Sequence, residues 1–332
     1  MTRDPVLSIS DLQVDFRTDA GAVQAVRGVD LDVAEGGVLG LVGESGCGKT
    51  VTMLAALGLL PRNASATGSV RFRGAELLGM PDRQLRRFRG ARMAMIFQDP
   101  VTSLNPVLTI GYQIAEVVRA HHPGTGREQA WGRAVDLLAL MGIPEPARRA
   151  RDYPHQLSGG MCQRAMIAMG VANDPDVLVA DEPTTALDVT IQAQILDLLR
   201  AIRIEKDVAI VLISHDLGVV AGLAEEVAVM YAGRVVERGQ VDDVYDRPRH
   251  PYTRGLLAAL PRLAAGARTP LRPIEGGPPS LRSVPPGCAF HSRCPHAESI
   301  CEEQDPALRP VGDVSAACHF AERFGSPDPT LR

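Results

Sequence analysis

The stretch that most constrains this chain covers residues 43–50 and reads Gly-Glu-Ser-Gly-Cys-Gly-Lys-Thr. It matches G-x-x-x-x-G-K-[ST], a loop whose backbone N–H groups surround a phosphate. The apolar residues 38–42 before it predict a buried strand, and residues 51–57 after it predict a helix. Strand, glycine-rich loop and helix in this order are the context that the motif requires. The alternative is a glycine-rich turn that opens a helix by chance.

Each part of this loop has an expected task. The glycines allow a tight turn, and the new helix adds the positive end of its dipole. We expect the Lys49 ammonium to reach the β- and γ-phosphates and the Thr50 hydroxyl to bind Mg²⁺. Lys49 and Lys206 are the only lysines among 35 basic residues, and a guanidinium would not fit the same cradle. The expected phosphate-binding residues are Gly43, Glu44, Ser45, Gly46, Cys47, Gly48, Lys49, Thr50 and Val51.

Composition narrows the class of protein. The chain has 332 residues, enough for two domains, with 45% hydrophobic and 22% charged residues. A net charge of −4 gives no global basic field that would attract nucleic acid. We see no signal peptide, and no apolar run reaches the length of a membrane span. Any role at a membrane is therefore expected to involve a partner.

The hydrophobic pattern predicts strands that alternate with helices. Residues 6–16 alternate as a half-buried strand, and with 23–33 and 68–74 they predict a small antiparallel layer. Buried strands are expected at 93–97, 176–180 and 208–214, a loop at 99–106, a helical insertion at about 106–172, and a hairpin about Ala232-Gly233. This order indicates an α/β fold with a parallel sheet covered on both faces.

Several polar residues stand where these elements end or begin. Asp181 and Glu182 follow one buried strand, where an acidic pair can hold Mg²⁺ through water and polarise an attacking water. Gln98 follows a second strand, where it could sense metal or water, and His215 follows a third, where its imidazole could contact a γ-phosphate. Ser158, Gly159 and Gly160 open a helix, with serine as N-cap and exposed N–H groups for an anion. Each of these residues alone is more often structural.

Taken together in this order, the motifs resemble the nucleotide-binding subunit of an ABC transporter, over about residues 5–255. The resemblance implies a P-loop ATPase fold with a mixed sheet core, an antiparallel β subdomain and an α-helical subdomain. It implies ATP and Mg²⁺, and a head-to-tail dimer in which the 158–160 stretch caps the ATP of the other subunit. Met161 departs from the usual glutamine. The implied roles are general base for Glu182, switch for His215, coupling residue and Mg²⁺ ligand for Gln98, dimer contact for the 186–188 loop with Asp188, and adenine stacking for Phe16.

Three stretches resemble the ATPases of dipeptide and oligopeptide importers: 98–106, 157–164 and 250–257. Nickel-importer ATPases are close relatives that share much of this pattern. The resemblance implies a second, distinct ATPase, two membrane permeases and an external substrate-binding protein as partners, with this chain at the cytoplasmic face of a bacterial membrane. It also implies two domains, a nucleotide-binding domain at 1–255 and a small irregular extension at 256–332.

Four cysteines occur in the expected extension, Cys288, Cys294, Cys301 and Cys318, with five, six and sixteen residues between them. The C-x-x-C pairs of structural zinc sites are absent. Such loose spacing favours loops wrapped around a [4Fe–4S] cluster over zinc, and it resembles the peptide-importer ATPases, where such a cluster is implied for some members. Two disulfides or four free thiols are the remaining alternatives, the former disfavoured in a reducing compartment.

Two different classes of function remain as alternatives. One is a soluble ABC-type ATPase acting on nucleic acid or ribosomes, which usually carries two cassettes or long coiled-coil insertions, and neither is visible here. The other is a subunit that holds ATP without hydrolysis, which the presence of Glu182 and His215 disfavours.

Overall fold

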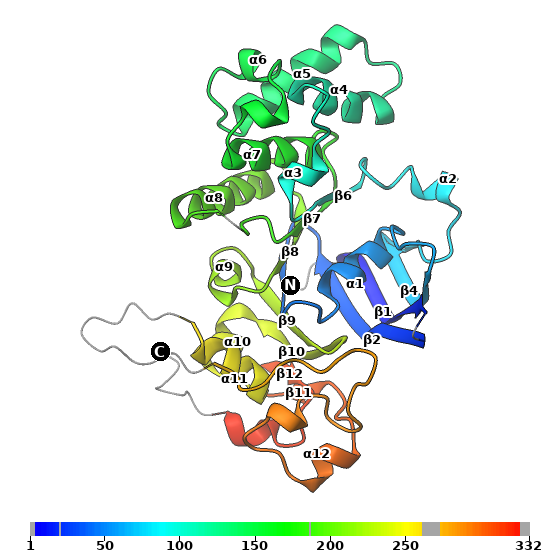
Figure 1. Cartoon of the computed structure of the whole chain (residues 1–332), viewed down its shortest axis with the longest axis vertical. Helices are drawn as coiled ribbons and strands as arrows, with labels where there is room; N and C mark the ends of the chain where they lie inside the picture. The colour runs from blue at the N-terminus through cyan, green and yellow to red at the C-terminus, as the bar shows by residue number, and fades with distance from the viewer. Residues whose placement is uncertain (1–3, 20, 186, 261–272, 326–332) are drawn as a thin grey trace, which may run out of the picture. The chain divides into compact units, whose positions relative to one another are not determined.

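The computed structural model describes residues 4–19, 21–185, 187–260 and 273–325 (Figure 1). The chain forms two compact units. Unit 1 comprises Met1–Leu7, Val33–Gly37 and Gly79–Ile213, and unit 2 comprises Ser8–Asp32, Val38–Leu78 and Ser214–Arg332. Ala186 of the expected dimer-contact loop and residues 261–272 and 326–332 of the expected extension lie outside the described residues. The domain boundary at 255/256 stays a prediction.

Unit 1 is built around three parallel strands. Its strands are β6 (Met93–Ile96), β7 (Val177–Asp181) and β8 (Ala209–Ser214). β7 pairs with both neighbours, with Val177 opposite Met93 on one side and Ala209 on the other. Every residue of β7 and β8 is buried. This explains their continuous apolar sequence, because strands covered on both faces have no polar side.

Helices cover these strands and extend from them. The helical elements of unit 1 are α2 (Asp82–Leu85), α3 (Pro100–Ser103), α4 (Ile110–His121), α5 (Arg127–Leu140), α6 (Pro146–Arg149), η1 (Pro154–Gln156), α7 (Gly159–Gly170) and α8 (Val189–Lys206). Helix α7 packs on the sheet at Gly170, where an added Cβ would lie 3.1 Å from Ile96 Cγ1. In Figure 1, α4, α5 and α6 group together with α7, in the stretch where we expected a helical insertion.

Two expectations near Gln98 are wrong. Strand β6 ends at Ile96, and Phe97 is 43% exposed rather than part of a buried strand. Residues 100–103 form the short helix α3 rather than a loop, because Pro100 suits a first helical turn and the Asp99 carbonyl accepts a 3.2 Å hydrogen bond from the Ser103 N–H. The chain therefore leaves the sheet one residue earlier than its hydrophobicity suggests.

Unit 2 holds two sheets. The first has the strand order β2-β1-β4-β5, and the second contains β3, β9, β10, β12 and β11. Strand β3 pairs in parallel with β9, whereas the later pairs are antiparallel, so this sheet is mixed. The hairpin about Ala232-Gly233 is confirmed by the β9–β10 pairing. The strands are β1 (Pro5–Thr18), β2 (Gly21–Ala34), β3 (Val38–Val42), β4 (Ala64–Phe72), β5 (Ala75–Glu76), β9 (Glu226–Tyr231), β10 (Arg234–Gln240), β11 (Arg309–Val311) and β12 (Val314–Ala316).

The C-terminal part of the chain adds to this second sheet. Strand β12 pairs with β10, with Ala316 opposite Glu237, and a small core of Val311, Ala316, Cys318 and Ala321 lies beside it. The helical elements of unit 2 are α1 (Lys49–Ala56), α9 (Leu217–Ala221), α10 (Val241–Asp246), α11 (Pro251–Ala258), η2 (His291–Arg293), α12 (Ser299–Glu303) and η3 (Ala321–Phe324). In the described residues, no helix combines the length and the apolar character needed to cross a bilayer.

Candidate functional site

The phosphate loop connects β3 to α1, as predicted. Its glycines are required by close backbone approaches as well as by positive φ angles. Gly43 has φ 152°, and an added Cβ would lie 2.2 Å from the Met230 carbonyl oxygen. Gly48 has φ 106°, and its Cβ would lie 2.6 Å from the Ala25 carbonyl oxygen. The backbones of β9 and β2 thus pack directly against the loop, and any side chain at Gly43 or Gly48 would displace it.

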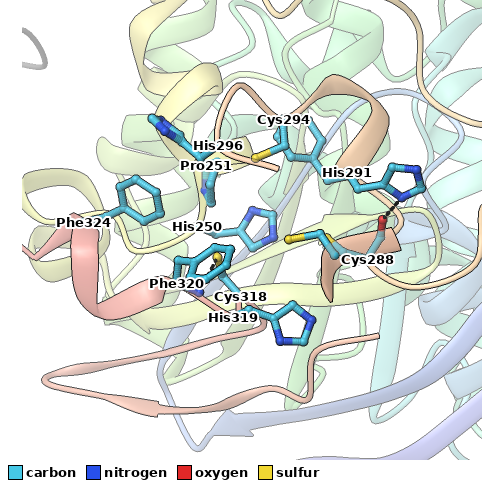
Figure 2. A pocket seen from close by; sticks show the side chains of 12 residues that line it. His250, Pro251, Cys288, His291, Cys294, His296, Cys318, His319, Phe320 and Phe324 are labelled. Carbon is cyan, nitrogen blue, oxygen red and sulfur yellow. Dashed lines mark hydrogen bonds between the residues drawn. The ribbon is translucent and has the colours of Figure 1, made fainter. Parts of the chain in front are cut away.

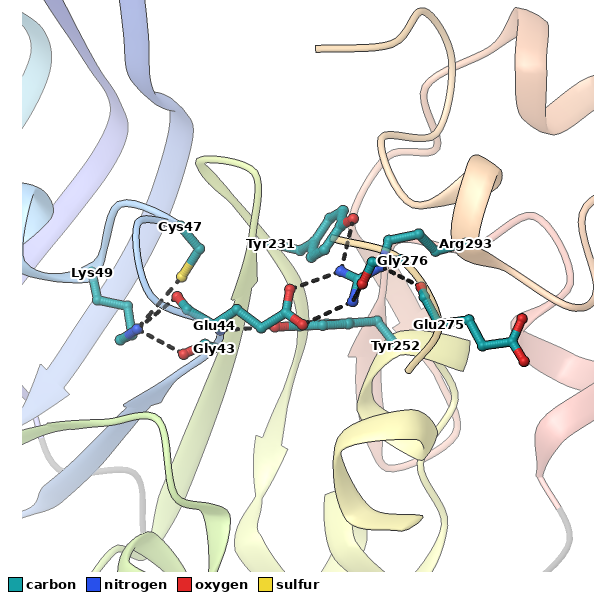
Figure 3. Close-up of polar contacts among 9 residues, drawn as sticks. All are labelled: Gly43, Glu44, Cys47, Lys49, Tyr231, Tyr252, Glu275, Gly276 and Arg293. Carbon is teal, nitrogen blue, oxygen red and sulfur yellow. Dashed lines mark hydrogen bonds and ion pairs between the residues drawn. The ribbon is translucent and has the colours of Figure 1, made fainter. Parts of the chain in front are cut away.

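Lys49 is the first residue of α1 and is 5% exposed. Its Nζ donates hydrogen bonds to the carbonyl oxygens of Gly43 at 2.7 Å and Glu44 at 3.0 Å (Figure 3). The ammonium therefore binds to the first two carbonyl groups of its own loop. No side chain caps the N-terminus of α1, and its first turn contains no acidic residue. This end of the helix keeps its positive character, which suits an anionic ligand.

A pocket of about 300 Å³ lies beside the loop, at the lower end of the range of ligand sites. Ser45 and Cys47 of the loop line this pocket together with Val23 of β2. The segment 278–282 completes the lining. Phe16, the expected adenine-stacking residue, is half-buried in β1 and is not among the lining residues. No local pattern in the sequence indicated that residues 278–282 would contribute to this pocket.

The acidic pair of unit 1 is confirmed as the end of a buried strand. Asp181 is 4% exposed at the end of β7, and Glu182 follows with φ 45°, a left-handed conformation that costs energy for a residue with a side chain. The Glu182 carboxylate accepts hydrogen bonds from Gln98 Nε2 at 2.8 Å and from the Thr185 hydroxyl at 2.8 Å. The structure thus brings together the two residues expected to act as base and as coupling residue.

The remaining predicted residues stand at element ends. Ser158 caps α7, and its hydroxyl accepts a hydrogen bond from the Met161 N–H at 3.3 Å. Gly159 is exposed, and a Cβ added there would meet nothing within 4 Å. Asp188 caps α8 by accepting a 3.0 Å bond from the Ile191 N–H. His215 follows β8 and is exposed.

Sequence reasoning missed an ion pair that holds the phosphate loop. The Arg293 guanidinium donates two hydrogen bonds to the Glu44 carboxylate, at 2.8 and 2.9 Å (Figure 3). The Tyr252 hydroxyl accepts a 2.9 Å bond from the Glu44 backbone N–H. Arg293 and Tyr252 lie more than two hundred residues after the loop, so no local pattern connects them to it.

The four C-terminal cysteines line a single cavity, as the metal hypothesis requires (Figure 2). All four are free thiols. Burial raises the pKa of Cys288, Cys294 and Cys318 to about 11 each, so these thiols are neutral at pH 7 in the absence of a metal. The cavity is otherwise lined by histidine and aromatic side chains and Pro251: His250, Phe290, His291, His296, His319, Phe320 and Phe324.

Three of the four cavity histidines have hydrogen-bond partners for a ring nitrogen. A ring nitrogen of His291 lies 2.9 Å from the Cys288 carbonyl oxygen, and one of His319 lies 2.9 Å from the Gln304 carbonyl oxygen. The His250 Nδ1 accepts a bond from the Tyr252 N–H, and burial lowers the pKa of His250 to about 3. In the described part of the chain, no group of three or more histidine, cysteine or acidic side chains is arranged to hold a metal ion.

Comparison with known proteins places these features in a family. Residues 26–185 match the family described as ABC transporter, and residues 236–301 match the oligopeptide/dipeptide transporter C-terminal region. The chain is 50% identical to the dipeptide transport ATP-binding protein DppD of Bacillus subtilis, over 91% of this chain and 90% of that protein. It is 52% identical to the oligopeptide transport ATP-binding protein OppD of Mycobacterium bovis, over 95% of this chain. It spans only 52% of the length of that mycobacterial protein.

Solved structures give the same result for the fold. A dimeric ATP-binding cassette bound to ADP and Pi matches with a TM-score of 0.64 and 26% identity, over 71% of this chain and 98% of that chain. A cassette from Clostridium perfringens, part of an ABC transporter complex, matches with a TM-score of 0.62 and 25% identity, over 73% of this chain and 91% of that chain. These similarities confirm the predicted fold class.

Proposed function

This chain belongs to the ABC transporter family of ATP-binding proteins, and on that premise we propose that it hydrolyses ATP to drive the import of di- or oligopeptides. The observation that carries the proposal is the phosphate loop, with its obligatory glycines and the buried Lys49 folded across it. A triphosphate entering the pocket replaces the two carbonyl partners of Lys49. The N–H groups of the loop and of α1 then surround the β-phosphate.

The proposed chemistry assigns the hydrolytic step to Glu182. Its carboxylate, oriented by Gln98 and Thr185, acts as general base for the attacking water. Thr50 and Gln98 would hold Mg²⁺, Asp181 would bind it through water, and His215 would contact the γ-phosphate. The resemblance of the motifs to those of ABC transporter ATPases supports these proposed roles. The 2.8 Å bond between Gln98 and Glu182 supports them because it couples the metal-binding amide to the base.

Replacing Glu182 with glutamine tests this assignment. We expect Glu182→Gln to bind ATP with Mg²⁺ as the parent does, but to lose steady-state phosphate release by at least about a hundredfold. The matched control is Glu128→Gln, which changes an exposed glutamate of α5 in the same unit. Unchanged hydrolysis in Glu182→Gln contradicts the role of this residue.

We also propose that the N-terminus of α7 serves a second ATPase subunit rather than this one. Ser158 and Gly159 are exposed, and the space beyond Gly159 is open within this chain. A glycine with free space around it has no internal reason to lack a side chain. Close approach of a nucleotide held by another subunit supplies such a reason. Asp188, exposed at the start of α8, belongs to the same proposed contact.

The proposed complex contains a distinct second ATPase, two membrane permeases and an external peptide-binding protein, with this chain bound peripherally at the cytoplasmic face. The match of residues 236–301 to the oligopeptide/dipeptide transporter C-terminal region supports peptides over nickel as the cargo. Affinity purification from gently solubilised membranes is the test. Recovery of two polytopic proteins supports the assignment, whereas recovery of ribosomes or nucleic acid supports the soluble ABC-type alternative.

For the cysteine cavity we propose a [4Fe–4S] cluster held by Cys288, Cys294, Cys301 and Cys318, with zinc as the alternative. Four thiols that line one cavity match the donor set of such a cluster. The sulfurs around a single zinc ion, each about 2.3 Å from it, lie closer together than those around a cube. The loose spacing of the four cysteines, without C-x-x-C pairs, favours the cluster over zinc. Its contribution is a structural cross-link of loops.

Anaerobic purification distinguishes these possibilities. Iron and sulfide in equal amounts, with absorbance near 400 nm, support the cluster. Zinc without iron supports the alternative, and neither metal in protein that still hydrolyses ATP argues against any resident metal.

A further inference from the structure

Glu44, in the second position of the phosphate loop, is held at three points. Its backbone N–H donates to the Tyr252 hydroxyl at 2.9 Å, and its carbonyl oxygen accepts from Lys49 Nζ at 3.0 Å. Its carboxylate accepts one hydrogen bond from each terminal nitrogen of Arg293, at 2.8 and 2.9 Å (Figure 3). A two-pronged, charge-assisted pair of this kind fixes both distance and orientation.

Arg293 is itself immobilised. Its side chain is 5% exposed. Besides Glu44, it donates to the Tyr231 hydroxyl at 3.3 Å and to the backbone carbonyls of Glu275 at 3.0 Å and Gly276 at 3.2 Å. The Glu44 carboxylate raises the pKa of Arg293, so the guanidinium stays charged. An arginine whose donors are all directed in this way acts as a rigid strut between two segments.

Arg293 belongs to the segment that carries two of the cavity cysteines. Arg293 ends η2, between Cys288 and Cys294 in the chain. Phe290 of the same segment lines the cysteine cavity and contacts Tyr231 of β9 and Tyr252 of α11, with ring centroids 5.2 Å and 5.4 Å away. One short segment therefore lines the cavity through Phe290 and binds the phosphate loop through Arg293.

Resting on the proposed ATP site, we infer that Arg293 is a positioning residue for nucleotide binding, which it controls through Glu44. Through its two hydrogen bonds to the Glu44 carboxylate, Arg293 holds the loop in the conformation that surrounds phosphate. It also neutralises a negative charge that would otherwise repel the nucleotide from the loop itself. Nucleotide affinity thus depends on the correct folding of the cysteine segment 288–294.

Binding of MgADP by isothermal titration to the full-length chain tests this inference, because ADP occupies the loop without turnover. We expect Arg293→Gln to raise Kd about tenfold, the equivalent of one charge-assisted hydrogen bond. Arg293→Lys, which keeps the charge but not the two-pronged geometry, should fall between the parent and Arg293→Gln. The matched control is Arg247→Gln, since Arg247 also links two segments of unit 2 through Asp243 at 2.6 Å and Asp313 at 3.0 Å.

A double-mutant cycle with Glu44→Gln separates positioning from general stability. If Arg293 acts through Glu44, Arg293→Gln should raise Kd by less than about twofold in the Glu44→Gln background. An equal rise in both backgrounds, or a normal Kd in Arg293→Gln, overturns the inference. If Arg293→Gln fails to fold, an unchanged Kd in Arg293→Lys overturns it instead. Failure of the parent chain to bind MgADP is a separate result, which refutes the proposed ATP site.

Discussion

The close approach at Gly287 allows a quantitative test of how the cysteine segment is held together. Gly287 has φ 68°, and an added Cβ would lie 2.4 Å from the Cys301 carbonyl oxygen. The same carbonyl accepts a 2.8 Å hydrogen bond from the Cys288 N–H. An alanine at 287 must therefore push apart the two backbone segments that carry these cysteines.

The cost of Gly287→Ala follows from these contacts. A left-handed conformation costs an L-residue about 1–2 kcal/mol, and breaking the Cys288–Cys301 bond adds about 1 kcal/mol. We expect the free energy of unfolding of unit 2 to fall by about 2–3 kcal/mol in total. A backbone oxygen cannot move aside as the end of a flexible side chain can, so local relaxation does not remove this cost.

Two neighbouring glycines provide matched controls. Gly276 has φ 72°, but its added Cβ would come no closer than 3.8 Å to Arg293 Cγ, so Gly276→Ala should cost only about 1 kcal/mol. Gly277 is exposed, and its Cβ would meet nothing within 4 Å, so Gly277→Ala should be neutral or slightly stabilising. The three variants thus separate backbone strain from steric overlap within one region of the chain.

The assay follows urea unfolding by pulsed thiol labelling of the metal-free, reduced chain. Mass spectrometry then reports the modification of the four cavity cysteines. The single tryptophan, Trp131, lies in unit 1, so its fluorescence would not report on the cavity. Equal urea midpoints for Gly287→Ala and Gly277→Ala would refute the argument that the glycine is required by the contact with Cys301.

Three further outcomes are expected. Lys49→Arg should raise the Kd for ATP at least about tenfold by calorimetry, because a planar guanidinium cannot take the place of a buried ammonium between two loop carbonyls; tight binding would contradict the cradle. Tyr252→Phe should raise that Kd about fivefold, since it removes the acceptor of the Glu44 N–H; an unchanged Kd would contradict this role. Burial raises the pKa of Glu237 from 4.5 to about 7, so the folded chain keeps a proton that the unfolded chain loses as pH rises between these values. Glu237→Gln should therefore gain stability relative to the parent between pH 4.5 and pH 7, by up to about 3 kcal/mol in urea unfolding; a difference independent of pH would contradict the buried carboxylate.

Much of the fold and part of the site follow from local sequence. Continuous apolar runs predicted β7 and β8, and the motif at 43–50 predicted the loop between β3 and α1. Such elements can be predicted from sequence because the residues within and beside a segment decide whether that segment forms a buried strand or a turn. Phe97 is the instructive failure, because hydrophobicity alone could not tell that the chain leaves the sheet after Ile96.

The residues that hold the phosphate loop in place could not be predicted from local sequence patterns. Nothing near Glu44 in sequence indicates that its carboxylate meets Arg293, or that its N–H meets Tyr252. The position of Phe16 outside the pocket lining, and the contribution of 278–282 to it, also depend on long-range packing. The sequence by itself determined the chemistry that this chain can perform, because the loop residues are contiguous. The tertiary structure alone decided what holds that loop in place, because those contacts join segments that only folding brings together.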